Sequence, residues 1–181
     1  MSELIKFNIK QHTQAPLRLA YEMDFNASPE ALFQTISDHN AVLNWVPLMK
    51  SVSMEHQQNN TQACDVGSVR HCSLHAMGGI DETILWWNPP YGYAFKVEAK
   101  SKIMMPTVDH VSVMQIDQLA EGGSHLTWQH YYNWRGLLMR HITAIMFPKM
   151  METALNNIRK VLHEAPEQTC ATTGCQKTCP K

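Results

Sequence analysis

The longest helix-forming stretch of the chain, residues 137–163, constrains the fold most. From Met150 onward its apolar side chains recur every three or four residues, which is typical of a helix packed by one face on a core. The segment before it, 137–147, is apolar on almost every side. It therefore needs cover from a sheet and, in addition, from a ligand, a partner subunit or a membrane. Pro148 lies between the two halves and lacks the N–H of a helical hydrogen bond, so it predicts a kink.

The sequence upstream predicts a sheet on which this helix packs. Strands are expected at 17–25, 48–56, 68–77, 80–87, 91–99, 107–119 and 124–134. Gly78-Gly79 and Gly122-Gly123 are predicted hairpin turns, so most of the sheet should be antiparallel. Ser28-Pro29 predicts the start of a short helix, and a second short helix is expected over 40–46. The predicted fold class is α+β, with about seven strands curled around one long helix.

Composition excludes several classes of protein. The chain has 181 residues and a net charge of −1, which indicates one domain and no nucleic-acid partner. No apolar run approaches the roughly 20 residues of a membrane span, and no signal-peptide core is present. Five cysteines are read as free thiols of a reducing compartment, so a cytoplasmic protein is expected. We expect an N-terminal arm over 1–16, one domain over 17–163, and a tail without regular structure over 164–181.

The histidines and cysteines do not form a recognisable metal site. His71 and His75 lie on one side of a predicted strand, without a carboxylate at ligand spacing. The tail thiols Cys170, Cys175 and Cys179 lack a nearby histidine and the usual zinc spacing. We therefore expect neither a metal nor a cofactor.

Two groups of polar residues in the strands are candidates for chemistry. Arg70 and Glu82 face each other across the predicted hairpin, where they would form either a buried ligand-orienting pair or a surface pair of little consequence. In the last strand, Gln129, Tyr131 and Asn133 share one side. Trp128, His130, Tyr132 and Trp134 share the other side. The residues alone do not decide which side faces the helix.

Four short motifs follow one another along the chain: Ala27-Ser28-Pro29-Glu30 leading to Asp38, Trp45-x-Pro47, Val52-x-Met54-Glu55 and Gly67-Ser68-Val69-Arg70. In this order they resemble the START-like, or SRPBCC, superfamily and its polyketide cyclase/dehydrase-like group. The resemblance covers 17–163. It implies a helix-grip fold, in which a seven-stranded antiparallel sheet curves around a long C-terminal helix and encloses a deep apolar cavity. Members of the superfamily bind lipids, sterols, polyketides and other apolar molecules, and a minority catalyse cyclisation, dehydration or condensation.

The resemblance also implies which side chains line that cavity. Its register turns Trp86 inward, and it favours the side of the last strand that carries Gln129, Tyr131 and Asn133. The loops 75–81 and 102–106 would form the cavity mouth. The implied ligand-binding residues are Arg70, Cys72, Leu74, Ala76, Glu82, Ile84, Phe95, Met104, Gln129, Tyr131, Met146, Met150 and Ala154.

Two functions fit these implied residues. The first is a carrier or sensor of a small hydrophobic molecule of the lipid, polyketide or aromatic type. The second is a cyclase or dehydratase that uses Arg70, Glu82 and Tyr131 to polarise its substrate and transfer protons. We favour the carrier because the predicted inner face holds few ionisable residues. A third interpretation makes the apolar segment 137–147 the contact surface of a homodimer.

Overall fold

A computed structural model describes residues 7–55, 66–75, 78–100 and 105–164. The strands are β1 (Leu17–Phe25), β2 (Met49–Glu55), β3 (Val69–Leu74), β4 (Gly78–Asn88), β5 (Gly92–Ala99), β6 (Thr107–Gln118) and β7 (Ser124–Trp134). The helices are α1 (Pro29–Ser37), α2 (Val42–Trp45) and α3 (Gly136–Glu164), preceded by the short 3-10 helix η1 (Ile9–Gln11). None of the helices in this part of the chain is both long and apolar enough to cross a membrane.

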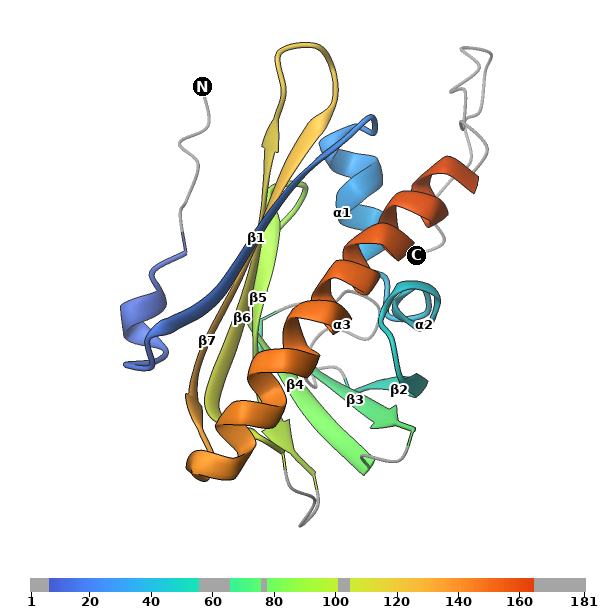
Figure 1. Cartoon of the computed structure of the whole chain (residues 1–181). Helices are drawn as coiled ribbons and strands as arrows, with labels where there is room; N and C mark the ends of the chain where they lie inside the picture. The colour runs from blue at the N-terminus through green and yellow to red at the C-terminus, as the bar shows by residue number, and fades with distance from the viewer. Residues whose placement is uncertain (1–6, 56–65, 76–77, 101–104, 165–181) are drawn as a thin grey trace.

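The seven strands form one antiparallel sheet in the order β1-β7-β6-β5-β4-β3-β2. α3 crosses one face of this curved sheet, and α1 and α2 lie beside it (Figure 1). The predicted α+β helix-grip architecture is therefore confirmed. Because successive strands from β2 to β7 are sheet neighbours, side chains of several consecutive strands meet under α3.

α1 begins where the sequence predicts, whereas α2 is shorter than the expected 40–46. The Ser28 hydroxyl accepts a hydrogen bond from the Ala31 amide at 3.3 Å, and Pro29 occupies the first turn of α1. α3 is a single helix that continues through Pro148. The predicted turn at Gly78-Gly79 is wrong, because Gly78 already pairs with Leu74 as the first residue of β4.

The main core lies between the sheet and α3. It contains aromatic and branched side chains of β4 to β7 together with one side of α3: Ile84, Tyr93, Phe95, Val97, Met114, Ile116, Leu126, Trp128, Met151, Ala154, Leu155 and Ile158. The repeat of these α3 residues at three and four positions explains why this half of the helix reads as amphipathic. We call the side of the sheet that contacts α3 the inner face and the opposite side the outer face.

The outer face carries a smaller apolar cluster that the N-terminal arm covers. Ala94, Val111 and Val113 are buried there, and Phe7 and Ile9 of the arm pack against them. Trp86 belongs to this cluster, so its predicted inward orientation is wrong. The reason is a bulge between Ile84 and Trp86, where the register of β4 against β5 shifts by one residue.

Candidate functional site

A charged pair is buried on the inner face, where β3 and β4 run side by side. Arg70 and Glu82 are directly paired in the two strands, and their exposed fractions are 3% and 7%. Arg70 Nε donates a hydrogen bond to Glu82 Oε2 at 2.6 Å. The predicted inward orientation of both residues is therefore confirmed, and the alternative of a surface pair is wrong.

Apolar and weakly polar groups surround this pair. The Arg70 guanidinium lies 5.4 Å from the centre of the Phe95 ring. The Cys72 thiol donates to Glu82 Oε2 at 3.5 Å. Burial alone would lower the pKa of Arg70, but the charge of Glu82, the neighbouring Tyr93 and Cys72 and the hydrogen bond to Glu82 together outweigh burial, and the pKa is raised. Burial, reinforced by Glu82, also raises the pKa of the Cys72 thiol. Arg70 therefore stays charged and Cys72 stays protonated at neutral pH.

The guanidinium of Arg70 contacts Glu82 through its Nε–H group. No described residue accepts a hydrogen bond from either Nη group. A guanidinium carries five N–H donors in a planar fork. The Nη edge of Arg70 therefore keeps donors that a ligand oxygen could use.

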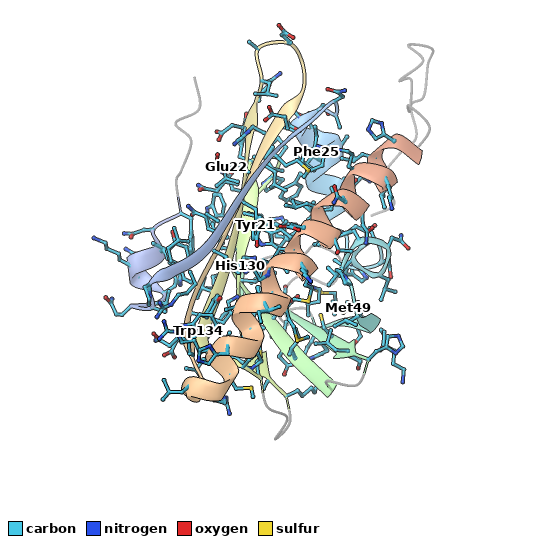
Figure 2. All side chains as sticks on the ribbon, viewed as in Figure 1. Tyr21, Glu22, Phe25, Met49, His130 and Trp134 are labelled. Atoms are coloured by element: carbon cyan, nitrogen blue, oxygen red, sulfur yellow. The ribbon has the colours of Figure 1, made fainter. Side chains whose placement is uncertain are left out.

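A second polar group lies on the inner face beneath the first half of α3. Nε2 of His110 (β6) and Nδ1 of His130 (β7) are 3.2 Å apart, and both residues are at most 4% exposed. His110 Nδ1 lies 3.4 Å from the Thr107 hydroxyl. Phe147 of α3 contacts both imidazoles, with ring centres 5.8 and 5.4 Å away. Figure 2 shows His130 on the side of the sheet that α3 crosses.

The two imidazoles are neutral in the folded protein. Burial lowers the pKa of His110 to about 4. Burial and the neighbouring His110 lower the pKa of His130 well below its usual value. One ring nitrogen of the contacting pair must then donate and the other accept. In both arrangements the second ring nitrogen of His130, Nε2, has no hydrogen-bond partner.

The two polar groups lie in one band across the sheet. Glu82 pairs with Val97 of β5, and Val97 pairs with His110 of β6. Only β5 therefore separates the charged pair from the imidazole pair. A molecule lying across Val97 and Phe95 would have an oxygen-binding group at each end.

The predicted orientation of the last strand is wrong. Trp128, His130 and Tyr132 are buried, whereas Gln129, Tyr131 and Asn133 are only half-buried and lie on the alternate side. Tyr131 packs against the outer cluster, and its hydroxyl donates to Gln129 Oε1 at 3.1 Å. The physical reason is bulk, since burying the rings of Trp128 and Tyr132 removes more apolar surface from water than burying two amides and one phenol would.

The remaining predicted site residues divide into three groups. Cys72, Ile84, Phe95 and Ala154 are buried, and Met150 packs against the main core, so these five are on the predicted side. Leu74 is half-buried at the end of β3. Ala76 and Met104 lie outside the described residues, as do the tail cysteines and residues 77, 102 and 103 of the predicted mouth loops.

Met146 is not on the inner face. It is 52% exposed, and Leu137 and Ile145 of the same half of α3 are 79% and 66% exposed. The prediction that Met146 forms the floor of a pocket is therefore wrong. Among the described side chains near Met146, that of Thr143 is buried, and its hydroxyl donates to the Met139 carbonyl at 2.6 Å. Because the Thr143 hydroxyl is satisfied by its own helix backbone, this side chain can be buried at a place where we expected an apolar side chain.

Sequence reasoning missed His110 and placed His130 on the outer face. A signal was present, because His130 alternates with Trp128 and Tyr132 in the pattern of a buried strand face. His110 follows Asp109, whose backbone φ is +51°, and the register of β6 against β7 shifts there. Such a bulge interrupts alternation, so the burial of His110 was not readable from its spacing.

Other polar groups lie away from this band. Nδ1 and Nε2 of His71 lie 2.6 Å from Asp81 and 3.1 Å from Glu55, and the hydrogen bonds to Asp81 and then Glu55 raise the pKa of His71. Two surface pockets also lie elsewhere. One is lined by residues 24–27 and the end of α3, and the other by the arm, Lys96 and residues near Asp109.

Comparisons with known proteins support a family assignment. The model of a family described as polyketide cyclase/dehydrase and lipid transport matches residues 16–163. No curated protein matches the sequence. Protein XoxI from Bacillus cereus has a similar structure, with 17% identity, a TM-score of 0.62, and 81% of this chain and 95% of that chain covered.

Two further solved structures share the fold. Ara h 8.0201 is 14% identical, with a TM-score of 0.61 over 82% of this chain and 99% of that one. A protein from Thermobifida fusca is 11% identical, with a TM-score of 0.62 over 80% and 91%. At such identities the likeness concerns the fold alone, so a functional assignment depends on the residues themselves.

Proposed function

The chain belongs to the polyketide cyclase/dehydrase and lipid transport family, as its motifs predicted, and on this premise we propose that it binds one small, mainly apolar molecule between the sheet and α3. Arg70 is the polar contact in this proposal, and the ligand is of the lipid, polyketide or aromatic type. The burial of the Arg70–Glu82 pair is the observation that carries the proposal. The setting we propose is the cytoplasm, where the buried free thiol of Cys72 would stay reduced.

Stability alone does not account for this pair. Removing two charges from water costs several kcal/mol per ion, and apolar residues of similar volume are often as stabilising as a buried ion pair. A perturbed, buried charge on the face where a family ligand would lie is therefore a candidate for binding. A hydrogen bond from the Nη edge of Arg70 to a ligand oxygen would explain why a charged pair occupies this buried position.

The charge balance indicates what kind of oxygen this is. Arg70 and Glu82 neutralise each other, so a carboxylate ligand would leave one negative charge without a partner in a low-dielectric site. A hydroxyl or carbonyl oxygen can accept from Nη without adding charge. Phe95, Ile84 and Met150 would bury the apolar remainder, at about 25 cal/mol for each Å² of apolar surface.

The position of Tyr131 favours a carrier over an enzyme. The cyclase or dehydratase alternative places Tyr131 beside Arg70 and Glu82 as a proton donor. Tyr131 packs with the outer cluster instead, and burial raises the pKa of its hydroxyl. Without that donor, the charged pair can orient a ligand but lacks the convergent acid that proton transfer requires.

Native mass spectrometry of protein purified without detergent tests this proposal. We expect an adduct of small-molecule mass that disappears on denaturation, and a smaller fraction of that adduct in Arg70→Met. Lys96→Met is the matched control, because Lys96 pairs with Glu98 at an exposed site. A bare mass in the wild type, together with no uptake of apolar probes, would contradict the proposal.

A further inference from the structure

Nε2 of His130 is a fully buried side-chain atom that lacks any hydrogen-bond partner among the described residues. Buried polar groups in proteins almost always have a partner, so an exception needs an explanation such as a ligand. His130 is 3% exposed and cannot reach bulk water in this conformation. Its other ring nitrogen is occupied, because His110 Nε2 lies 3.2 Å from it.

The surroundings of His130 hold the imidazole in place. Trp128 lies 5.0 Å from it between ring centres, and the Trp128 indole donates to the Ser112 hydroxyl at 2.8 Å. Phe147 of α3 lies edge-on at 5.4 Å from His130 and contacts both imidazoles. A ligand that reaches this ring from the side of α3 would therefore meet Phe147.

We propose that Nε2 of His130 is a second polar contact for the bound molecule, so that the ligand carries two oxygen functions, one near Arg70 and one near His130. This inference rests on the proposed function, since it assigns the second end of the same ligand. The oxygen at His130 is a hydroxyl or a carbonyl, because the imidazole is neutral and a charged group would lack a counterion there.

The imidazole pair suits either kind of oxygen. If His110 donates to His130 Nδ1, then Nε2 of His130 carries a proton and can donate to a carbonyl. If His130 donates to His110 Nε2, then Nε2 of His130 is a lone-pair acceptor for a hydroxyl. Thr107 can partner Nδ1 of His110 in both cases, because its hydroxyl both donates and accepts. The pair therefore exchanges tautomers without taking up a net proton.

The sheet geometry sets the length of such a ligand. Phe95 pairs with Ser112, and Ser112 pairs with His130, so two strand spacings of about 4.8 Å separate Phe95 from His130. The Arg70 guanidinium lies over the Phe95 ring, 5.4 Å from the ring centre. The two oxygens are then on the order of 10 to 15 Å apart. A molecule with two or more fused or linked rings, or a chain of similar length, meets this requirement.

Three probes that differ only in their hydroxyl groups test the inference: biphenyl, 4-hydroxybiphenyl and 4,4′-dihydroxybiphenyl. Isothermal titration calorimetry measures their dissociation constants for the wild type, Arg70→Met and His130→Phe, with His125→Phe, at a half-buried position of the same strand, as control. We expect 4,4′-dihydroxybiphenyl to bind the wild type more tightly than 4-hydroxybiphenyl by roughly two- to tenfold, the effect of one net hydrogen bond. His130→Phe should abolish that gain, and His125→Phe should keep it.

A spectroscopic measurement keeps the test decisive if His130→Phe does not fold. With 15N-labelled histidine, the Nε2 resonance of His130 in the wild type should shift when 4,4′-dihydroxybiphenyl binds. An unchanged resonance in the bound state would overturn the inference and would indicate a buried water or a permanently unpaired nitrogen.

The outcomes separate the two proposals. If the second hydroxyl still improves binding in His130→Phe but the gain depends on Arg70, the contact at His130 is wrong and the Arg70 contact stands. If none of the three probes binds the wild type, both proposals are overturned.

Discussion

Nε of Arg70 lies 2.6 Å from Oε2 of Glu82, and both side chains are almost completely buried on the inner face of the sheet. Each charge is tolerated in this environment only because the other is present. The loss of one partner should therefore have a different effect from the loss of both, and this difference can be measured.

Single substitutions of the pair should destabilise the protein strongly. Arg70→Met or Glu82→Leu leaves one buried charge without its partner, which costs about 3 to 5 kcal/mol. The double variant Arg70→Met/Glu82→Leu should recover most of this loss. Urea denaturation measures each free energy of unfolding. Lys96→Met, at an exposed pair, should cost less than about 1 kcal/mol. A double variant as unstable as the sum of the singles would contradict this account.

The buried imidazoles should make the protein less stable in mild acid. Between pH 6.5 and about 4, His110 is protonated in the unfolded chain but neutral when folded, so protons favour unfolding. Stability from this residue is complete above pH 6.5 and is lost as pH falls through 4, by about 3 kcal/mol. His130 acts in the same direction.

The matched variant for this pH effect is His110→Phe/His130→Phe. Its free energy of unfolding should fall less steeply than that of the wild type over the same pH range. The raised pKa of His71 has the opposite sign, since its contribution is present below pH 6.5 and lost at higher pH. His71 is common to both proteins and cancels in the comparison. Parallel pH profiles would exclude the imidazole pair as the cause.

Gly92 should not tolerate a side chain. Its φ is +137°, and a Cβ atom there would lie 2.1 Å from the Met114 carbonyl oxygen. Gly122 also has a positive φ, +95°, but has open space around it. We expect Gly92→Ala to lower the free energy of unfolding by at least about 3 kcal/mol more than Gly122→Ala, as judged by thermal and urea unfolding. Equal effects would mean that β5 can shift away from β6.

The Cys72 thiol should be inert in the folded protein. Burial and then the neighbouring Glu82 raise its pKa, and the thiolate is the reactive form. Treatment with iodoacetamide followed by peptide mapping should leave Cys72 unmodified until urea unfolds the chain. Labelling of Cys72 in native buffer at the rate seen in urea would show that β3 opens locally.

The N-terminal arm should contribute to stability through the outer face. The Phe7 ring stacks on His12 at 4.8 Å and lies 5.8 Å from the Trp86 ring. Phe7→Ala should lower the free energy of unfolding by about 1 to 2 kcal/mol. Leu17→Ala, at a position 45% exposed, should cost far less. If the two variants unfold at the same urea concentration, the arm contributes nothing measurable.

The strand pattern of the fold was predictable because alternation is regular where one strand face is buried. Residues 17–25 illustrate this, since the predicted strand and β1 have the same bounds. The order of the elements and the motifs between them then identified the architecture. The inward orientation of Arg70 and Glu82 also followed, because no bulge interrupts their pairing.

Orientation was not predictable where both sides of a segment carry similar residues. In β7 each side contains large rings and polar groups, so burial was decided by packing against α3. In residues 137–147 nearly every position is apolar, and such a segment has no preferred face from which to place Met146. The burial of His110 was not predictable, because the bulge at Asp109 interrupts the alternation of the strand and no local sequence pattern predicts where that bulge lies.

The bulge in β4 also determines how this strand tolerates changes in length. It places the consecutive residues Leu85 and Trp86 in the outer cluster, so that Ile84 and Trp87 on either side of them both lie in the main core. A deletion of Leu85 would remove the bulge and leave Ile84, Trp86 and Trp87 in regular alternation, whereas a deletion of Thr83 would turn either Glu82 or Ile84 to the outer face. Related sequences should therefore lose a residue of β4 at the bulge and not between Glu82 and Ile84.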